Sequence, residues 1–367
     1  MKLALICRPF IFHGGVETAT AGLVGELARR GHAVDLLTTR AQRPLPGVTV
    51  RPLPMLPVPR LARVLIFGLA ARAATRGRDY DVVQSHERTL AADIYRAGEG
   101  THRGYLEAMG RAHRQNSYHR FLIYLERRLF QLQSAQAIVA ISAGGKAEIE
   151  RLYGTPPERV TLIYNGVDLA RFTPDNRALH RAAMRAELGV DAADWCVLFV
   201  GSGFERKGLG PLVEALASIG DRRARLIVAG KGNHAPYAAQ AERLGLRDRV
   251  VWTGPRPDVD RLYAAADLVA LPARYEPFGN VHLEALASGV PMLSSVHAGG
   301  AELIRNGVNG WVAEEVSGPR IAEGLERLRS ADAKALAAQA RASAEPYPYA
   351  AQAERFEALY RRNPAFH

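Results

Sequence analysis

The chain twice runs from a short buried strand through a glycine-rich turn into a helix, and this repeated unit limits the folds it can adopt. The first unit joins the apolar run 3–7 to a helix that follows Gly14 and Gly15. The second joins the run 195–200 to a helix that follows the loop 201–208. Further strands and helices alternate after each, which favours parallel sheets covered by helices. The sequence therefore predicts an α/β chain with two doubly wound domains.

The length of 367 residues supports this division, because one hydrophobic core rarely serves more than about 300 residues. We expect an N-terminal domain over 1–168, an interdomain linker over the polar stretch 169–190, and a C-terminal domain over 191–345. The last stretch, 346–367, is expected to form a helix that packs back on the N-terminal domain.

The net charge of +11 suggests an anionic partner, although a solvated basic surface would also account for it. Nucleic acid is disfavoured as a partner, because the sequence lacks an aromatic RNA-binding motif, zinc-finger spacing or a clear helix-turn-helix. Cys7 and Cys196 lie in apolar runs, as expected of buried free thiols in a reducing compartment. No apolar run has the length of a signal peptide or membrane span, so we expect a cytoplasmic protein.

The stretch ARYEPFGNVHLEALASG carries two carboxylates at a strand-to-helix turn, Glu276 before the turn and Glu284 inside the helix. Gly279 allows close backbone approach, and the amides of Gly279, Asn280 and Val281 begin a helix, where phosphate is attracted. Glu284 would reach toward a ribose. The alternative is an ordinary turn with two solvated glutamates.

Four further residues are candidates for contacts with a diphosphate, a base or a sugar. Arg206 and Lys207 beside a helix N-terminus would form a trap for a diphosphate, since arginine offers a planar fork and lysine a point charge. The alternative is a solvated charge pair on a turn. Arg256 lies in a loop where a base could stack. Glu17 would either complement the dipole of the first helix or hydrogen-bond a sugar.

The segment 98–130 mixes cations with aromatic rings on a predicted helical hairpin. That combination suits anionic lipid headgroups and the membrane boundary, so we expect peripheral association with a membrane surface. Its run FLIYL is instead interpreted as packing on the domain. The residues are Arg103, Arg111, Arg114, Arg120, Arg127, Arg128, Tyr105, Tyr118, Phe121, Tyr124 and Phe130.

Taken together, EPFGNVHLEALASGVPMLSS, GSGFERKGLGPLVEALA, YGTPPERVTLIYNGVD and PFIFHGGVET resemble the family-four retaining glycosyltransferases of GT-B fold. Within that family, GSGFERKG and DIYRAGEGTHRGYL are most similar to the bacterial lipopolysaccharide core glycosyltransferases. The resemblance implies two facing Rossmann-like domains with a cleft between them. It also implies transfer of a hexose from a nucleotide-diphosphate sugar, with UDP the expected carrier, to a lipopolysaccharide core or related glycolipid at the inner face of the bacterial inner membrane.

The resemblance also implies roles for individual residues. Glu276 would face the donor sugar, Glu284 would bind the ribose, and Arg206 with Lys207 would hold the diphosphate without a metal or other cofactor. Gly15 would approach the phosphates from the first domain. Glu99 occupies the place of a polar group near the reacting centre, and His86 and His102 are candidates for acceptor contact, although a lone histidine is more often structural.

This sequence departs from the family pattern at two positions. Ser202 stands where many members have arginine, so Arg206 would carry more of the charge compensation. Glu99 stands where similar sequences often have aspartate or histidine, which leaves open whether Glu99 or a donor phosphate oxygen takes the acceptor proton.

Two other functions stay open. One is a nucleotide-sugar 2-epimerase of the same fold, which needs no membrane-held acceptor. The other is a basic membrane-surface or nucleic-acid binding module without catalysis, which leaves the Glu276 turn and the Arg206 loop without a purpose.

Overall fold

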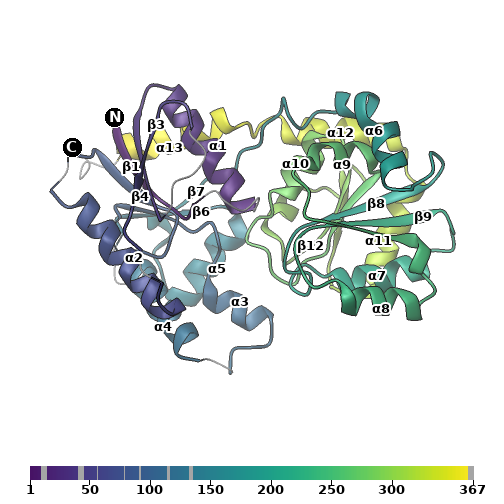
Figure 1. Cartoon of the computed structure of the whole chain (residues 1–367), viewed down its shortest axis with the longest axis horizontal. Coiled ribbons are helices and arrows are strands. Elements are labelled where there is room, and N and C mark those ends of the chain that lie inside the picture. The colour runs from purple at the N-terminus through teal and green to yellow at the C-terminus, as the bar shows by residue number, and fades with distance from the viewer. Residues whose placement is uncertain are drawn as a thin grey trace. The chain divides into compact units, whose positions relative to one another are not determined.

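The computed structural model describes residues 1–9, 15–39, 45–55, 57–77, 79–90, 92–113, 116–131 and 135–362, and it divides into two compact units (Figure 1). Unit 1 comprises Met1–Gly166 together with Tyr349–His367, and unit 2 comprises Val167–Pro348. The chain therefore passes from unit 1 to unit 2 and back again.

Unit 1 is built on a parallel sheet which, in the part of the chain that the structure describes, has the strand order β3-β2-β1-β4-β5-β6-β7. Helices cover both faces of this sheet (Figure 1). The strands are β1 (Lys2–Ile6), β2 (Ala33–Thr38), β3 (Val48–Pro52), β4 (Val82–Ser85), β5 (Ile94–Arg96), β6 (Ala137–Ala140) and β7 (Val160–Leu162). The helices are α1 (Gly15–Arg29), α2 (Arg60–Thr75), α3 (His102–Ala108), α4 (Ser117–Phe130), α5 (Ala143–Tyr153), the 3-10 helix η1 (Pro157–Arg159) and α13 (Tyr349–Arg362).

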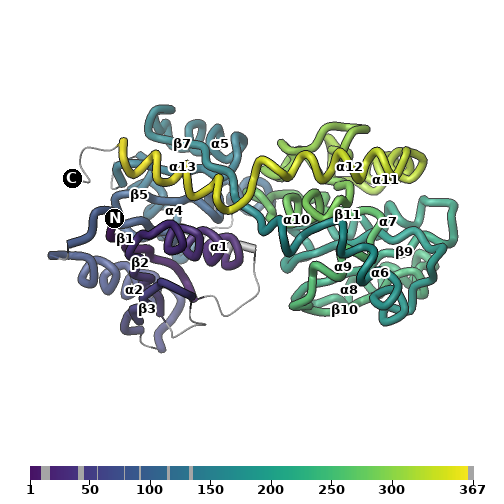
Figure 2. The backbone as a smooth tube through the Cα atoms, turned by 90° about the horizontal axis from the view of Figure 1, so that it is seen from above, coloured from purple at the N-terminus to yellow at the C-terminus, as the bar shows by residue number. Residues whose placement is uncertain are grey.

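The C-terminal helix α13 packs beside α1, and Figure 2 shows the two running next to each other. Ala353, Phe356 and Tyr360 of α13 enter the same hydrophobic core as Leu3 and Leu23. This burial stabilises the placement of α13 on unit 1. The two cysteines are buried and free.

Unit 2 repeats the pattern with the strand order β10-β9-β8-β11-β12-β13, again parallel. The strands are β8 (Trp195–Val200), β9 (Ala224–Ala229), β10 (Val250–Gly254), β11 (Leu268–Leu271), β12 (Met292–Ser295) and β13 (Gly310–Ala313). The helices are α6 (Asp175–Glu187), α7 (Leu209–Ser218), α8 (Ala235–Arg243), η2 (Arg247–Arg249), α9 (Val259–Ala265), α10 (Val281–Ala287), η3 (Gly299–Leu303), α11 (Gly318–Ser330) and α12 (Ala333–Ala344).

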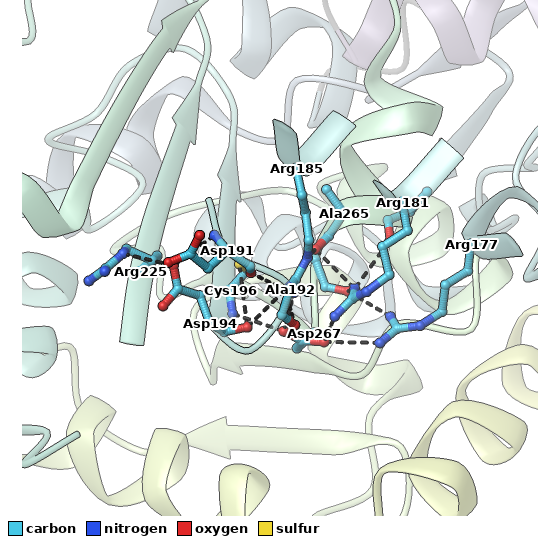
Figure 3. A network of polar contacts seen from close by, with 12 residues as sticks. Arg177, Arg181, Arg185, Asp191, Ala192, Asp194, Cys196, Arg225, Ala265 and Asp267 are labelled. Carbon is cyan, nitrogen blue, oxygen red and sulfur yellow. Dashed lines mark hydrogen bonds and ion pairs between the residues drawn. The ribbon is translucent and has the colours of Figure 1, made fainter. Parts of the chain in front are cut away.

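The predicted linker 169–190 is wrong as a linker, because the structure places it inside unit 2. Its helix α6 packs on α9. Arg177, Arg181 and Arg185, one helical turn apart, all bind the carboxylate of Asp267, at N–O distances of 3.0, 2.6 and 2.7 Å (Figure 3). The polar composition that suggested a solvated connection belongs to this ion-pair network.

Each sheet has one place where the strand order reverses, between β1 and β4 in unit 1 and between β8 and β11 in unit 2. In doubly wound sheets, ligands bind outside the carboxyl ends of the strands at this point. The loops that follow these four strands are therefore the first places to look for a site.

Candidate functional site

In unit 2, the loop after β8 and the turn after β11 bring two cations onto one carboxylate. Glu276 lies 3.0 Å from the Arg206 Nη1 atom and 3.2 Å from the Lys207 Nζ atom. Their side chains keep small exposed fractions, 27% for Arg206, 11% for Lys207 and 12% for Glu276. The sequence prediction grouped these three residues by function, and the structure brings them into contact.

Backbone hydrogen bonds fix the turn that carries Glu276. Its amide donates to the carbonyl of His297 at 3.1 Å, and its carbonyl accepts from the amide of Gly299 at 2.8 Å. The carbonyl of Phe278 accepts from Gly300 at 2.8 Å. On the other side, Arg206 donates through Nη1 to the carbonyl of Tyr275 at 2.6 Å. The carboxylate is therefore held on a rigid backbone rather than on a free loop.

Glycine is required at two positions of this site. Gly208 has φ of +76°, and a Cβ there would lie 1.9 Å from the carbonyl oxygen of Pro272. Gly279 has φ of +79°, and a Cβ there would lie 3.0 Å from the Glu276 Cγ atom. A side chain at either position would be strained, and at Gly208 it would also push the loop after β8 away from Pro272.

The two cations keep Glu276 ionised. Burial by itself raises the pKa of this carboxyl group, but Lys207 and then Arg206 outweigh burial and lower the pKa to about 2. At neutral pH the three groups together therefore carry one net positive charge, which suits an anionic ligand.

The second carboxylate of the motif, Glu284, has a different environment. It lies in the first turn of α10, partly buried, and accepts a hydrogen bond of 2.7 Å from the hydroxyl of Tyr263. Burial raises its pKa above the ordinary value. Gly279 and Asn280 lead directly into α10, and Val281 is its first residue.

His282 is a buried residue of this site that the sequence reasoning missed. Its Nδ1 atom lies 2.8 Å from the Gly279 carbonyl, and its Nε2 atom lies 2.7 Å from the Ser294 hydroxyl. A carbonyl can only accept, so Nδ1 carries the hydrogen and Nε2 accepts from Ser294. Burial lowers its pKa to about 4, so the neutral ring ties the turn to β12. A single histidine in an apolar helix gives no signal of this role.

Arg256, the candidate for stacking on a base, is held by two carboxylates in the structure. Its guanidinium is bound by Glu187 of α6 and by Asp258, each at 2.6 Å. These ion pairs arise because the supposed linker is folded against the loop. A role in stacking on a base remains a prediction.

In unit 1, Glu99 lies between two arginines. The Arg8 Nη2 atom lies 2.6 Å and the Arg88 Nη1 atom 2.7 Å from its carboxylate oxygens. Burial raises its pKa, but Arg88 and then Arg8 outweigh burial and hold the pKa below the ordinary value. Glu99 is therefore a weak proton acceptor at neutral pH.

The two candidate acceptor histidines have internal partners. His86 is 2% exposed, and its ring nitrogens contact the Thr20 hydroxyl at 2.9 Å and the Gln84 amide at 2.7 Å. His102 contacts His119 at 2.9 Å between ring nitrogens. The burial of His86 argues for a structural role in the interior of unit 1.

The first turn of α1 contains the other two predicted residues. Gly15 is the first residue of the helix, and Glu17 follows as a buried acidic side chain in its first turn. Gly14 lies outside the described residues. Among the residues that the structure describes, no group of three or more His, Cys, Asp or Glu side chains could hold a metal ion.

Two family models together match most of the chain. The model described as Glycosyltransferase Family 4 matches residues 13–171, and the model described as Glycosyl transferases group 1 matches residues 180–345. A probable transglycosylase of Burkholderia thailandensis is 31% identical over 307 residues, which is 83% of this chain and 80% of that protein. The lipopolysaccharide glucosyltransferase WaaG of Escherichia coli K12 is 27% identical over 320 residues, 86% of each chain.

Solved structures agree with these matches. The crystal structure of WaaG has a TM-score of 0.86 at 26% identity and covers 98% of this chain and 99% of its own. Anabaena HepE, solved with UDP-glucose, has a TM-score of 0.78 at 21% identity, with 99% and 100% covered, which shows the fold alone. This chain therefore belongs to the family-four, group 1 glycosyltransferases of GT-B fold.

Proposed function

We propose that this enzyme is a retaining glycosyltransferase that moves a hexose from a UDP-sugar to a lipopolysaccharide core or related glycolipid acceptor. The part of this proposal that concerns the nucleotide-sugar donor rests on one observation. Arg206, Lys207 and Glu276 cluster at the point where the strand order of unit 2 reverses. A positively charged cluster at this place suits the diphosphate of a nucleotide sugar.

The chemistry follows from the leaving group. When the bond between sugar and diphosphate breaks, negative charge develops on the phosphate oxygens, and fixed cations stabilise it. Arg206 and Lys207 would supply that charge, so we propose that transfer needs no metal ion. Transfer that continues in excess EDTA would support this, and transfer restored only by added Mg²⁺ or Mn²⁺ would contradict it.

The identity of the substrates is proposed from the relatives. WaaG is named as a lipopolysaccharide glucosyltransferase, and HepE was solved with UDP-glucose, so UDP-glucose is the first donor to test. Because Glu99 is held ionised by two arginines, we favour a donor phosphate oxygen over Glu99 as the group that takes the acceptor proton. Glu99 would then orient the acceptor.

The product distinguishes transfer from 2-epimerisation. We would incubate the enzyme with UDP-glucose and a lipopolysaccharide core oligosaccharide and follow both by NMR. The proposal predicts UDP release and a new glycosidic bond with the anomeric configuration of the donor. An inverted configuration would contradict retention, and a 2-epimer of the donor without transfer would identify an epimerase.

We also propose that unit 1 docks on an anionic membrane, because α2 and α4 lie against each other and both are basic (Figure 1). The acidic residue within these two helices is Glu126, which is buried. Leu65, Leu69 and Tyr124 are exposed by 43%, 68% and 53%.

Of the FLIYL run, Leu122 and Leu125 pack inside, as expected, whereas Tyr124 does not. The exposed arginines are Arg60, Arg63, Arg72, Arg120, Arg127 and Arg128.

Among the described helices, none combines the length and apolarity needed to cross a bilayer. The surface proposal predicts that Leu65→Ser/Leu69→Ser, and separately Arg120→Ser/Arg128→Ser, weaken co-sedimentation with phosphatidylcholine vesicles that contain phosphatidylglycerol. Leu179→Ser, at a leucine of unit 2 that is 70% exposed, is the control. Unchanged binding in both double variants would reject this surface.

A further inference from the structure

Unit 1 has its own charged cluster where its strand order reverses. Arg8 follows β1 and Glu87 follows β4, the two strands between which the order reverses. The two side chains form a two-point ion pair, with Nε to Oε1 at 2.8 Å and Nη2 to Oε2 at 3.0 Å. Arg8 also contacts Glu99, which follows β5, at 2.6 Å. We call Arg8, Glu87 and Glu99 the Arg8 cluster.

We call Arg206, Lys207 and Glu276 of unit 2 the donor cluster, after the role proposed for them above. The Arg8 cluster corresponds to it in topology. There, Arg206 follows β8 and pairs with Glu276, which follows β11. In each unit, therefore, an arginine after one central strand binds a glutamate after the neighbouring strand, across the reversal of strand order. In doubly wound sheets, ligands bind where the strand order reverses. Both places are therefore candidate ligand sites.

We propose that Arg8 and Glu87 determine acceptor specificity, and that the Arg8 cluster selects an accepting sugar residue without phosphate. This inference rests on the proposed function, because it assumes that the enzyme has a sugar acceptor. It adds Arg8 and Glu87 to the residues that would contact the acceptor.

The side chains of the Arg8 cluster are accessible to a ligand, and neighbouring ion pairs fix their positions. Side-chain exposure is 41% for Arg8, 29% for Glu99 and 18% for Glu87. Behind them, Arg88 joins Glu99 to the fully buried Glu126, whose carboxylate lies 3.0 Å from the Arg88 Nε atom. Carboxylate oxygens accept from sugar hydroxyls and the guanidinium donates to them, which is the chemistry a polyol needs.

The charge of the cluster argues for a neutral acceptor sugar. Arg8 and Arg88 face Glu87, Glu99 and Glu126, so the connected group carries one net negative charge. The donor cluster of unit 2 has the opposite balance, two cations and one carboxylate. A phosphate placed against Glu87 and Glu99 would be repelled, whereas hydroxyl groups would not.

The first test is Glu87→Gln, which keeps the shape and removes the charge. We expect the calorimetric Kd for a phosphate-free core oligosaccharide, and the acceptor KM with UDP-glucose, to rise about tenfold or more, because the variant loses charge-assisted hydrogen bonds to sugar hydroxyls. The Kd for UDP should stay within about twofold of wild type. Glu107→Gln, which removes a carboxylate paired with Arg103 on α3, is the matched control.

The second test compares the same oligosaccharide with and without phosphate on the accepting sugar. We expect wild type to have a higher kcat/KM and a lower Kd for the phosphate-free oligosaccharide than for the phosphorylated one. In Glu87→Gln, the values for the two oligosaccharides should lie closer together. A preference for the phosphorylated form would overturn the inference. So would unchanged acceptor binding in both Glu87→Gln and Arg8→Gln, each checked for a wild-type thermal midpoint, or loss of UDP binding in Glu87→Gln.

These outcomes are separable from failure of the proposed function. If wild type transfers no sugar, the proposed function fails, and the calorimetric comparison of oligosaccharides still tests the subsite. If wild type transfers sugar and the Glu87→Gln variant has the same acceptor KM, only this inference fails.

Discussion

At the scale of single residues, environment separates carboxylates that look alike in sequence. Glu276 and Glu284 belong to one motif, yet two cations lower the pKa of Glu276 to about 2 while burial raises the pKa of Glu284. Glu276 is therefore an ionised group fixed beside the cations. Glu284, which accepts from Tyr263, is the more easily protonated of the two.

Removal of Glu276 tests this reading of the donor cluster. We predict that Glu276→Ala and, separately, Lys207→Ala lower kcat/KM for sugar transfer roughly a hundredfold to a thousandfold, the cost of losing one preorganised charged group. The circular dichroism spectrum should be unchanged, because backbone hydrogen bonds hold the turn. Normal turnover in a folded Glu276→Ala protein would reject the site.

The same residue gives a pH prediction. Because the folded-state pKa of Glu276 is near 2, it stays ionised throughout the range in which enzymes are assayed. The kcat/KM profile should therefore show no acid limb from Glu276 between pH 5 and 8, values at least about three units above that pKa. A fall in kcat/KM toward acid within this range, present in wild type and absent in Glu276→Gln, would contradict the view that Glu276 stays ionised.

The sequence predicted pairing across the fold only where the family resemblance supplied it. Glu276 and Arg206 are 70 residues apart, and the resemblance, not a local pattern, placed them at one site. Arg8 and Glu87 are 79 residues apart, and their pairing depends on β1 and β4 being neighbours in the sheet. No local pattern in the sequence contains that information.

At the scale of elements, the helix α6 shows why a polar stretch can be misjudged. The positions of Arg177, Arg181 and Arg185 resemble a solvated face in sequence, but all three bind Asp267, which also accepts from the amide of Cys196 at 2.9 Å. Composition identified 169–190 as polar but could not identify the carboxylate that α6 binds, which lies 82 residues beyond Arg185.

Asp267→Ala should therefore destabilise unit 2. Arg185 is only 3% exposed in its side chain, so losing its carboxylate leaves a buried charge without its counterion, at a cost of roughly 3 kcal/mol in the free energy of unfolding by urea. Arg177→Ala, at a side chain 48% exposed, is the control and should cost less than about 1 kcal/mol. Equal costs would show that the network does not hold α6.

The pH dependence of this effect has a definite sign. Burial raises the pKa of Asp267, but the Cys196 amide, Arg181 and Arg185 outweigh burial and hold the pKa below its ordinary value. A carboxyl group with a lowered folded-state pKa contributes stability above its unfolded-state pKa and loses it as the pH falls through the folded-state pKa. The difference between wild type and Asp267→Ala should therefore be full at pH 7 and shrink only in acid.

At the scale of the whole molecule, the two sheets share the order of six strands, which β7 extends in unit 1, and they carry clusters of opposite charge at the same topological place. The sequence predicted the α/β fold from its repeated strand, turn and helix units, and the family match supports the GT-B class. It placed the first boundary at 168, near the observed Gly166, but could not assign α6 to unit 2. The reason is that the assignment depends on tertiary ion pairs.

The most direct test of the donor site is calorimetric titration of UDP and UDP-glucose into wild type and into Arg206→Ala/Lys207→Ala. Arg222→Ala/Arg223→Ala, which removes two exposed arginines elsewhere in unit 2, controls for net charge. The donor assignment predicts binding by wild type and by the control, and a Kd raised about a hundredfold or more in the Arg206/Lys207 variant. Equal affinity in all three proteins, or no binding of either ligand by wild type, would contradict it.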